Sequence, residues 1–325
     1  MSAAPAGPPV GLFELSIQGR HAPALFVTGW LATLLGLGAT VVGVVSGASV
    51  GAAATVLLTA GLAILSIGFV LLGGSQTVER AAAGRAYAGP SPVLVFAALL
   101  TTTLVVAVLV GVPLELAGVR LDRAVGDLVS VGVQALVFIG VVRLMVVGPG
   151  AISWADMGFG QSGRRVARAL LEGASLAVPV VAVTLLLAGL LVLVFGNAPP
   201  SPLPPTGTTS GLILHLLAGA VIAPIAEEIV FRGVAVTAWA RTNGAWVAII
   251  RASVLFAVAH VLLIGGQSFG EAASLAIVGA AARLPVAIAL GWIYLRQGTI
   301  WSSIGLHAAF NAVLILLAER AMLGG

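Results

Sequence analysis

Residues 226–232 are Ala226-Glu227-Glu228-Ile229-Val230-Phe231-Arg232, which places two adjacent carboxylates and one guanidinium in an otherwise apolar run. An ionisable side chain at membrane depth is costly, so its presence there indicates a functional site. On an α-helix, residues four apart share a face, whereas adjacent residues diverge by about 100°. We therefore expect Glu228 to pair with Arg232 and Glu227 to stay free for chemistry. A purely structural ion pair would explain Glu228 and Arg232 but not Glu227.

The composition is that of an integral membrane protein. Of the 325 residues, 60% are hydrophobic and only 8% are charged, whereas soluble domains have about 25% charged residues. The net charge of +4 comes without a dense basic patch, which argues against a nucleic-acid partner. Cysteine is absent from the sequence, so disulfides, thiol catalysis and thiolate metal ligands are excluded.

Apolar runs of about 20 residues, the length that crosses a bilayer, predict an all-α polytopic fold with about eight or nine transmembrane helices. The sixth run is unusually long, and it contains Pro224, which disrupts the helical hydrogen-bond ladder close to the two glutamates. The runs lie at 23–46, 51–73, 92–112, 128–148, 173–196, 210–240, 244–263, 272–296 and 299–319.

The chain is expected to have three parts: a flexible tail over 1–22, an accessory transmembrane bundle over 23–150, and a core over 151–325. Arginine is more frequent in the loops that face inward when the N-terminus is inside. We therefore predict a multi-pass protein of the plasma (inner) membrane, in contact with the lipid bilayer, with a cytoplasmic N-terminus. The oligomeric state is left open.

A second polar group follows on the next apolar run, which contains Phe256-Ala257-Val258-Ala259-His260. The turn between this run and the previous one is near residue 244. Glu227 lies about 16 residues before this turn, and His260 lies about 16 residues after it. In an antiparallel helical hairpin, the two side chains are therefore expected at similar depth. A histidine in an apolar helix can also serve packing alone.

A third polar group is on the last apolar run, where His307 and Asn311 are one helical turn apart and share a face. The small residues between them, Ala308 and Ala309, permit a neighbouring helix to approach closely. Hydrogen bonding between helices would explain Asn311 alone, but it explains the pair less well.

The three motifs EExxxR, FxxxH and HxxxN, in this order on three spans, resemble the CPBP family of intramembrane proteases. That family includes the CAAX prenyl endopeptidases and the Abi proteins linked to bacteriocin immunity. The resemblance covers about 205–318, roughly a third of the chain, and it implies a CAAX-protease-like helical core. The motif positions are filled by Glu227, Glu228, Arg232, Phe256, His260, His307 and Asn311.

The resemblance implies an endopeptidase that hydrolyses a peptide bond of a membrane-associated peptide or protein tail. Glu227 would be the general base that activates the attacking water, and His260 would help to hold that water. His307 and Asn311 would stabilise the oxyanion. The remaining carboxylate, Glu228, would be fixed by its pairing with the arginine of the first motif.

Metal dependence stays open at this point. If a metal is used, such as Zn²⁺ or another divalent ion, its ligands would be Glu227, His260 and His307, each from a separate helix. The sequence has no HExxH motif, in which two histidines on one helical face bind zinc. We therefore favour a metal-free mechanism based on glutamate.

Two other functions are compatible with these residues. Intramembrane Glu, His and Arg also build proton and ion pathways, which would make the protein a transporter or channel. A non-catalytic protein of the bacteriocin-immunity type would keep the fold without the activity. Arg283, at mid-span near Pro285, is expected either to line the same cavity or to pair with Glu271, whereas His215 is expected to serve packing.

Overall fold

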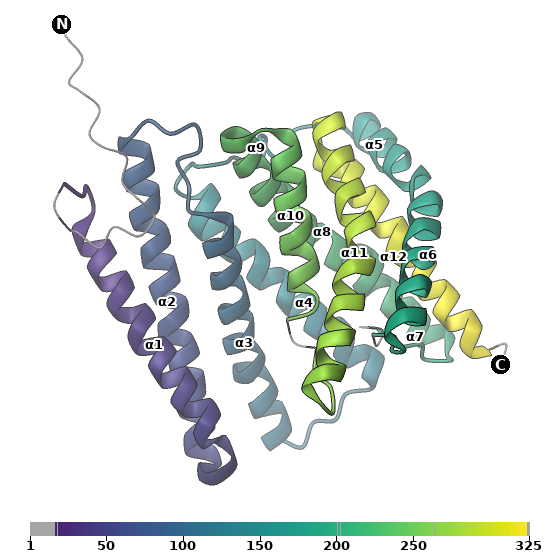
Figure 1. Ribbon diagram of the computed structural model, residues 1–325, viewed down its shortest axis with the longest axis horizontal. Helices are drawn as coiled ribbons and strands as arrows, with labels where there is room; N and C mark the ends of the chain where they lie inside the picture. The colour runs from purple at the N-terminus through teal and green to yellow at the C-terminus, as the bar shows by residue number, and fades with distance from the viewer. Residues whose placement is uncertain (1–16, 18, 200, 202, 263, 324–325) are drawn as a thin grey trace, which may run out of the picture. The chain divides into compact units, whose positions relative to one another are not determined.

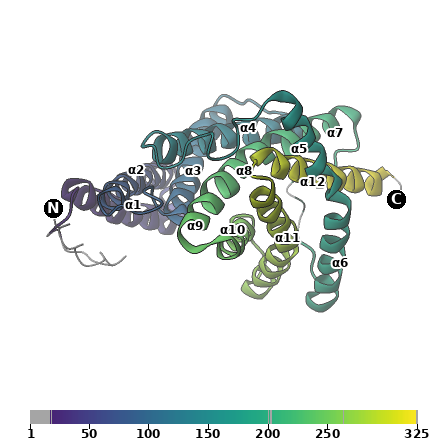
Figure 2. The same ribbon diagram turned by 90° about the horizontal axis from the view of Figure 1, so that it is seen from above.

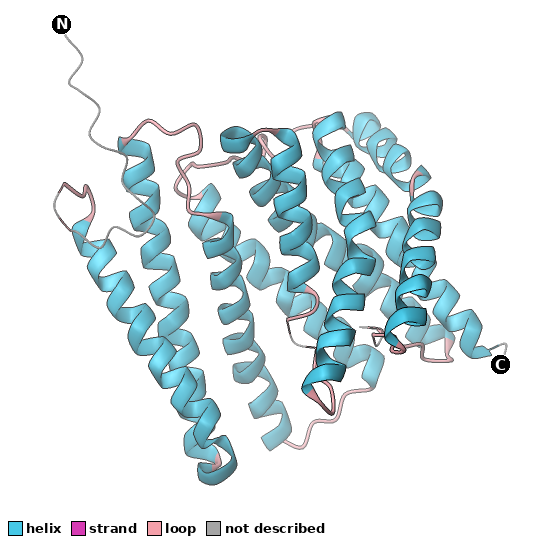
Figure 3. Ribbon diagram, in the orientation of Figure 1, coloured by secondary structure: helices cyan, strands magenta, loops and turns pink. Residues whose placement is uncertain are grey.

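The computed structural model describes residues 17, 19–199, 201, 203–262 and 264–323. Every regular element among these residues is a helix, and no strand is present in them (Figure 3). This confirms the all-α fold that the apolar runs predict. The chain divides into two compact units, of which one comprises 1–105 with 144–151 and the other comprises 106–143 with 152–325. The proposed division of the chain near residue 150 stays a prediction.

The first unit is dominated by the hairpin of α1 and α2, which lie side by side in Figure 1. Glycines let the two backbones meet, because a Cβ at Gly36 would lie 2.3 Å from the backbone nitrogen of Leu65. The glycines that make such contacts recur every seven residues on each helix: Gly29, Gly36 and Gly43, then Gly61 and Gly68. The elements of this unit are α1 (Pro23–Val50), α2 (Ala52–Ala82), the first part of α3 (Pro92–Leu116) and most of the π-helical turn η1 (Arg143–Val147).

The second unit contains the remaining elements. Its first helices are α4 (Arg123–Val142), α5 (Gly163–Ser175) and α6 (Ala177–Phe195). The long sixth apolar run is divided into α7 (Thr209–Leu216), η2 (Leu217–Ile222), α8 (Ala223–Glu228), η3 (Ile229–Val236) and α9 (Thr237–Asn243), where η2 and η3 are π-helical. The last helices are α10 (Ala245–Ala259), α11 (Phe269–Gln297) and α12 (Ile300–Leu323).

The core of the second unit lies where α6, α11 and α12 meet. Buried aliphatic and aromatic side chains from these three helices form one cluster: Ala177, Val181, Val286, Leu290, Ile293, Leu306 and Phe310. Beside it, α5 and α12 approach backbone to backbone, since a Cβ on Gly173 would lie 2.0 Å from the carbonyl oxygen of Ser302. A Cβ on Gly305 would likewise lie 2.2 Å from the carbonyl oxygen of Leu170. These contacts hold α12 in place against the rest of the unit.

The short helix α8 lies in the middle of the second unit, with α4 on one side and α10 and α11 on the other (Figure 2). The segment from η2 to η3 also contacts α12. Pro224 is in the first turn of α8 and directly follows the π-helical turn η2. Proline cannot donate a backbone hydrogen bond, and π-helical turns are frequent at functional sites. The predicted disruption of the helical hydrogen-bond pattern in this span is therefore present on both sides of α8, in η2 and in η3.

Eight helices of the described residues are long and apolar enough to cross a membrane, and one shorter apolar helix, α10, follows α9. About eight or nine spans were expected from nine apolar runs, of which the seventh was placed at 244–263. The difference arises because α10 has only 15 residues, which is about 22 Å at 1.5 Å per residue and short of the hydrocarbon thickness. The helix ends at His260, where the polar site begins. The tail predicted over 1–22 lies mostly outside the described residues.

Candidate active site

Glu228 and Arg232 form a fully buried ion pair. Arg232 Nη1 donates to Glu228 Oε1 at 2.8 Å, and Arg232 Nη2 donates to the carbonyl oxygen of Ala287 on α11 at 3.1 Å. The side chains of Glu228 and Arg232 are 0% and 1% exposed. The pairing inferred from helical spacing is confirmed. Through the bond to Ala287, the pair also links the end of α8 to α11. Loss of either charged partner would leave a buried charge uncompensated, which is strongly destabilising.

Glu227 points to a different set of side chains. Its Oε2 atom lies 3.7 Å from His260 Nε2 and also 3.7 Å from His307 Nε2. Glu227 is 18% exposed and His260 is 25% exposed, whereas His307 is almost completely buried. The similar depth expected for Glu227 and His260 is confirmed. A separation of 3.7 Å is too long for a hydrogen bond but fits two groups that hold one water molecule between them.

The other ring nitrogen of each histidine is already bonded. His260 Nδ1 lies 2.8 Å from the carbonyl oxygen of Phe256, and His307 Nδ1 lies 2.8 Å from Glu228 Oε1. A carbonyl and a carboxylate oxygen accept hydrogen bonds, so in both rings Nδ1 carries the proton and donates it. Both Nε2 atoms are therefore turned toward Glu227. The Glu228 carboxylate thus orients His307 as well as Arg232.

Phe256 packs against both histidines. Its ring centroid lies 4.3 Å from that of His260 and 5.8 Å from that of His307. The Arg232 guanidinium lies over the same ring, 4.9 Å from the centroid. The motif analysis assigned no role to Phe256. Its place in the FxxxH spacing was the available signal, and the structure shows that its aromatic ring contacts both histidine rings and the Arg232 guanidinium.

Asn311 contacts the backbone of the π-helical turn η2. Asn311 Nδ2 donates to the carbonyl oxygen of Gly219 at 2.7 Å. In a π-helical turn the regular i to i−4 hydrogen bonds are displaced, which makes such a carbonyl available to a side chain. The contact ties α12, which also carries His307, to the segment just before the two glutamates. The remaining N–H of the Asn311 amide is not used by this bond.

Arg283 lies near Glu227 without forming an ion pair. Arg283 Nη1 donates to the carbonyl oxygen of Gly279 at 2.7 Å, and its charge interacts with that of Glu227. Of the two expectations for Arg283, pairing with Glu271 is not observed. Glu271 instead caps α11, where its Oε2 accepts from the backbone N–H of Gln267 at 2.7 Å.

The residues proposed as metal ligands are close together but do not form a recognisable metal site. Within the described part of the chain, no group of three or more His, Cys, Asp or Glu side chains is arranged to hold a metal ion. Zinc needs its ligands about 2.0–2.2 Å from one central point. The roles proposed for Glu227, His260 and His307 are therefore those of the side chains themselves.

With this geometry, the comparison with known families is informative. Residues 209–313 match the model of a family described as Type II CAAX prenyl endopeptidase Rce1-like. Over these residues, about a third of the chain, the protein is similar to the Rce1-like family. The members of that family are described as CAAX prenyl endopeptidases, which are proteases. No curated protein and no solved structure matched the chain.

The Rce1-like region begins on α7, where His215 packs against α4 through a polar contact. His215 is buried, and its Nε2 lies 3.1 Å from Asp127 Oδ2 on α4. A polar contact between two apolar helices stabilises their packing. His215 was expected to pack only, and the structure adds Asp127 as its partner. Neither side chain is among the contacts of Glu227.

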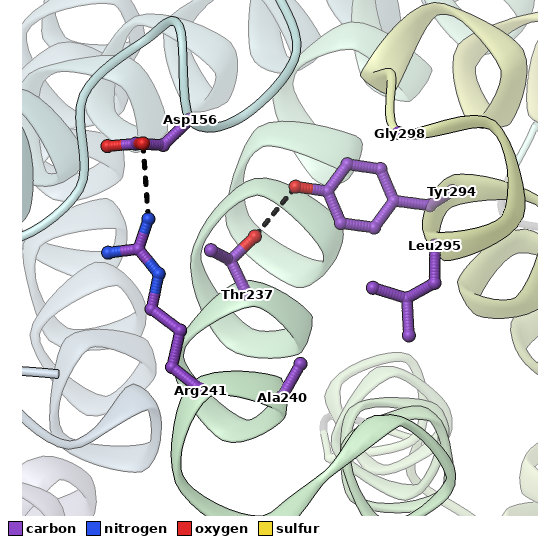
Figure 4. A pocket seen from close by; sticks show the side chains of 7 residues that line it. All are labelled: Asp156, Thr237, Ala240, Arg241, Tyr294, Leu295 and Gly298. Atoms are coloured by element: carbon purple, nitrogen blue, oxygen red, sulfur yellow. Dashed lines mark hydrogen bonds and ion pairs between the residues drawn. The ribbon is translucent and has the colours of Figure 1, made fainter. Parts of the chain in front are cut away.

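A cavity of about 400 Å³ lies where α9 faces the C-terminal end of α11. Asp156 and Arg241 form an ion pair of 3.2 Å on one side of it, and Tyr294 contacts Thr237 at 2.6 Å on the other (Figure 4). None of the motif residues lines this cavity. Its wall is nevertheless connected to the site, because the Thr237 hydroxyl donates to the carbonyl oxygen of Arg232 at 3.2 Å.

Proposed function

We propose that the protein hydrolyses a peptide bond of a membrane-associated peptide or protein tail, with water as the nucleophile and Glu227 as the general base. The observation that supports this is the position of Glu227 Oε2, 3.7 Å from Nε2 of both His260 and His307. One water molecule fits between a carboxylate and an imidazole at this separation. Glu227 is also the more exposed of the two glutamates, so substrate can reach it.

In the proposed reaction, Glu227 accepts a proton from the water while the water oxygen attacks the scissile carbonyl carbon. His260 Nε2 accepts the second hydrogen bond of that water and so orients it. The tetrahedral intermediate collapses when the C–N bond breaks, and the proton held by Glu227 passes to the leaving amine. General acid–base catalysis of this kind contributes about 10²- to 10⁴-fold to the rate.

His307 and Asn311 are proposed to stabilise the oxyanion. His307 Nδ1 donates to Glu228, so His307 can donate to the oxyanion only when both ring nitrogens are protonated, and its Nε2–H then points to the space beside Glu227. Asn311 has one amide N–H left beyond its bond to Gly219. A donor aimed at a developing oxyanion is worth about 3–4 kcal/mol. The buried Glu228–Arg232 pair serves to position these groups.

The membrane and the orientation are part of the proposal. The eight long apolar helices make the protein an integral multi-pass membrane protein. The arginine bias of the loops supports the plasma (inner) membrane with a cytoplasmic N-terminus. A tag that is reactive only from one side of sealed vesicles, placed next to the first span, tests this orientation.

The test of the reaction is cleavage of a peptide library by the purified protein in liposomes. Glu227→Gln is expected to lower product formation by about 10²-fold or more while the protein stays folded. Glu172→Gln is the matched control, because Glu172 is paired with Arg168 away from the site. A parallel arm with a chelator tests metal dependence. Equal cleavage by wild type and a folded Glu227→Gln variant would refute the role of Glu227.

A further inference from the structure

Arg283 is a charged residue near the site that the proposed mechanism does not use. It is the fifteenth of the 29 residues of α11, so about 14 residues, or roughly 21 Å, separate it from either end of the helix. That distance is too long for an arginine side chain to reach the membrane surface by extending along the helix. The charge must therefore be balanced inside the protein.

Arg283 and Arg232 differ in the groups that neutralise their charges. Arg232 has the carboxylate of Glu228 at 2.8 Å. Among the described residues, no carboxylate lies within ion-pair distance of Arg283, and its only hydrogen bond goes to the carbonyl oxygen of Gly279. Most of the five N–H donors of its guanidinium are therefore available. An available guanidinium in a low-dielectric site favours binding of an anion.

The Arg283 side chain lies beside the segment that follows His260. A Cβ on Gly279 would lie 3.3 Å from Arg283 Nη1, 3.1 Å from Val261 and 3.4 Å from Ile264. The guanidinium thus lies against the segment that directly follows His260, and glycine at position 279 leaves room for it. Its charge also interacts with that of Glu227. An anion bound here would be beside the general base and the water-binding histidine.

We infer that Arg283 binds a carboxylate of the peptide substrate, and that this carboxylate is the free C-terminal group. This inference rests on the proposed peptide hydrolysis. A planar guanidinium matches a carboxylate with two parallel hydrogen bonds. The C-terminal carboxylate is present in every protein tail whatever its sequence, whereas Asp and Glu side chains are not. Arg283 is therefore a specificity residue that selects bonds near a C-terminus.

The experiment compares one peptide as the free acid and as the C-terminal amide, both cut by the protein in liposomes. The wild type is expected to prefer the acid by about 10- to 100-fold in kcat/KM, the range of a hydrogen bond between charged groups. Arg283→Gln should cut both peptides at the rate of the wild type on the amide. Arg283→Lys should keep part of the preference, because lysine keeps the charge but not the planar fork.

The matched control is Arg251→Gln. Arg251 is an exposed residue of α10 whose Nη1 donates to Asn243 Oδ1 at 3.0 Å, and its loss should leave the preference for the acid intact. No preference in the wild type, or a full preference in Arg283→Gln, would overturn the inference. A third peptide, an amide with an aspartate near its end, distinguishes the two sources of carboxylate. If that aspartate restores cleavage to the rate of the free acid, the assignment of Arg283 to the C-terminal carboxylate is overturned.

A separate measurement distinguishes this inference from the proposed reaction. If no peptide is cut in a Glu227-dependent manner, peptide hydrolysis fails whatever Arg283 does. Binding of the acid and amide peptides to the intact Glu227→Gln protein is then compared with binding to Glu227→Gln/Arg283→Gln. Tighter binding of the acid that disappears in the double variant supports the carboxylate site. Equal binding of the two peptides to both proteins overturns it.

Discussion

The α1–α2 hairpin and the α5–α12 pair use the same packing device, but only the second pair contributes a residue to the candidate site. In both pairs, glycines bring backbones together so closely that a Cβ would clash with the facing chain. Lipid supplies little hydrophobic drive for helices to associate, so close packing has to supply it. The α1 helix has no charged residue, whereas α12 carries His307 in contact with two glutamates.

The difference between these regions shows what each feature is for. In the α1–α2 hairpin, glycines let the two backbones approach closely. The α8–η3 segment instead buries the charges of Glu228 and Arg232, and the cost of burying them indicates a function beyond packing. Mutations that separate stability from activity in the two regions can break or sharpen this comparison.

The largest effect on stability is expected from Arg232→Met. Removal of the guanidinium leaves the fully buried Glu228 carboxylate without its partner, which typically costs about 3–5 kcal/mol. The double variant Glu228→Gln/Arg232→Met should recover part of that loss, because no uncompensated charge is left. Chemical denaturation in detergent micelles measures both values. A double variant no more stable than Arg232→Met would show that the pair is not the cause.

An intermediate effect is expected from Gly36→Ala in the first unit. Its Cβ would lie 2.3 Å from the backbone of Leu65, so α1 and α2 must move apart, at a cost of about 1–3 kcal/mol. Gly38→Ala is the matched control, since a Cβ there meets no atom within 4 Å. Thermal unfolding should separate the two variants. Peptide cleavage should remain at the wild-type rate in both, and a loss in Gly36→Ala would connect the hairpin to catalysis.

The smallest effect is expected from Asp156, which lies outside the membrane spans. Hydrogen bonds from the backbone N–H and then the hydroxyl of Ser153 lower the pKa of Asp156 below its usual value of 3.8, and Arg241 lowers it further. The carboxylate therefore stabilises the fold above about pH 3.8, and this contribution is lost as the pH falls through the lowered pKa.

Asp156→Asn should remove this pH dependence. The side chain is 43% exposed, so solvent screening limits the change to less than about 1 kcal/mol. The difference in unfolding midpoint between wild type and Asp156→Asn should be measurable at pH 7 and should shrink at pH 3. A difference that stays constant between the two pH values would contradict the assignment to the Asp156 charge.

Much of the site could be predicted from helical spacing. The pairing of Glu228 with Arg232 follows from four-residue spacing, and the shared depth of Glu227 and His260 follows from their equal distance from one turn. Both relations depend on local helix geometry, which the sequence specifies directly. The low charge content and the long apolar runs likewise predicted an all-helical membrane protein.

Other features depended on how the helices pack. The early end of α10 at His260 and the π-helical turns around α8 were not specified by apolar runs, because hydropathy does not determine where a helical hydrogen-bond pattern changes. The contacts from Asn311 to the carbonyl of Gly219 and from Arg232 to that of Ala287 are between segments far apart in sequence. Backbone acceptors of this kind have no signature in a side-chain motif.

The sequence by itself therefore determined the class of fold, the ionisable groups of the site and the neighbours that each has along its own helix. Only the tertiary structure decided how His307 is oriented, because its Nδ1 atom is fixed by Glu228 from a different helix, whereas His260 Nδ1 bonds the carbonyl of Phe256 one turn earlier on α10. It also decided that Arg232 is paired and Arg283 is not. In a low-dielectric interior, the partner that a charge finds across the helices determines its role.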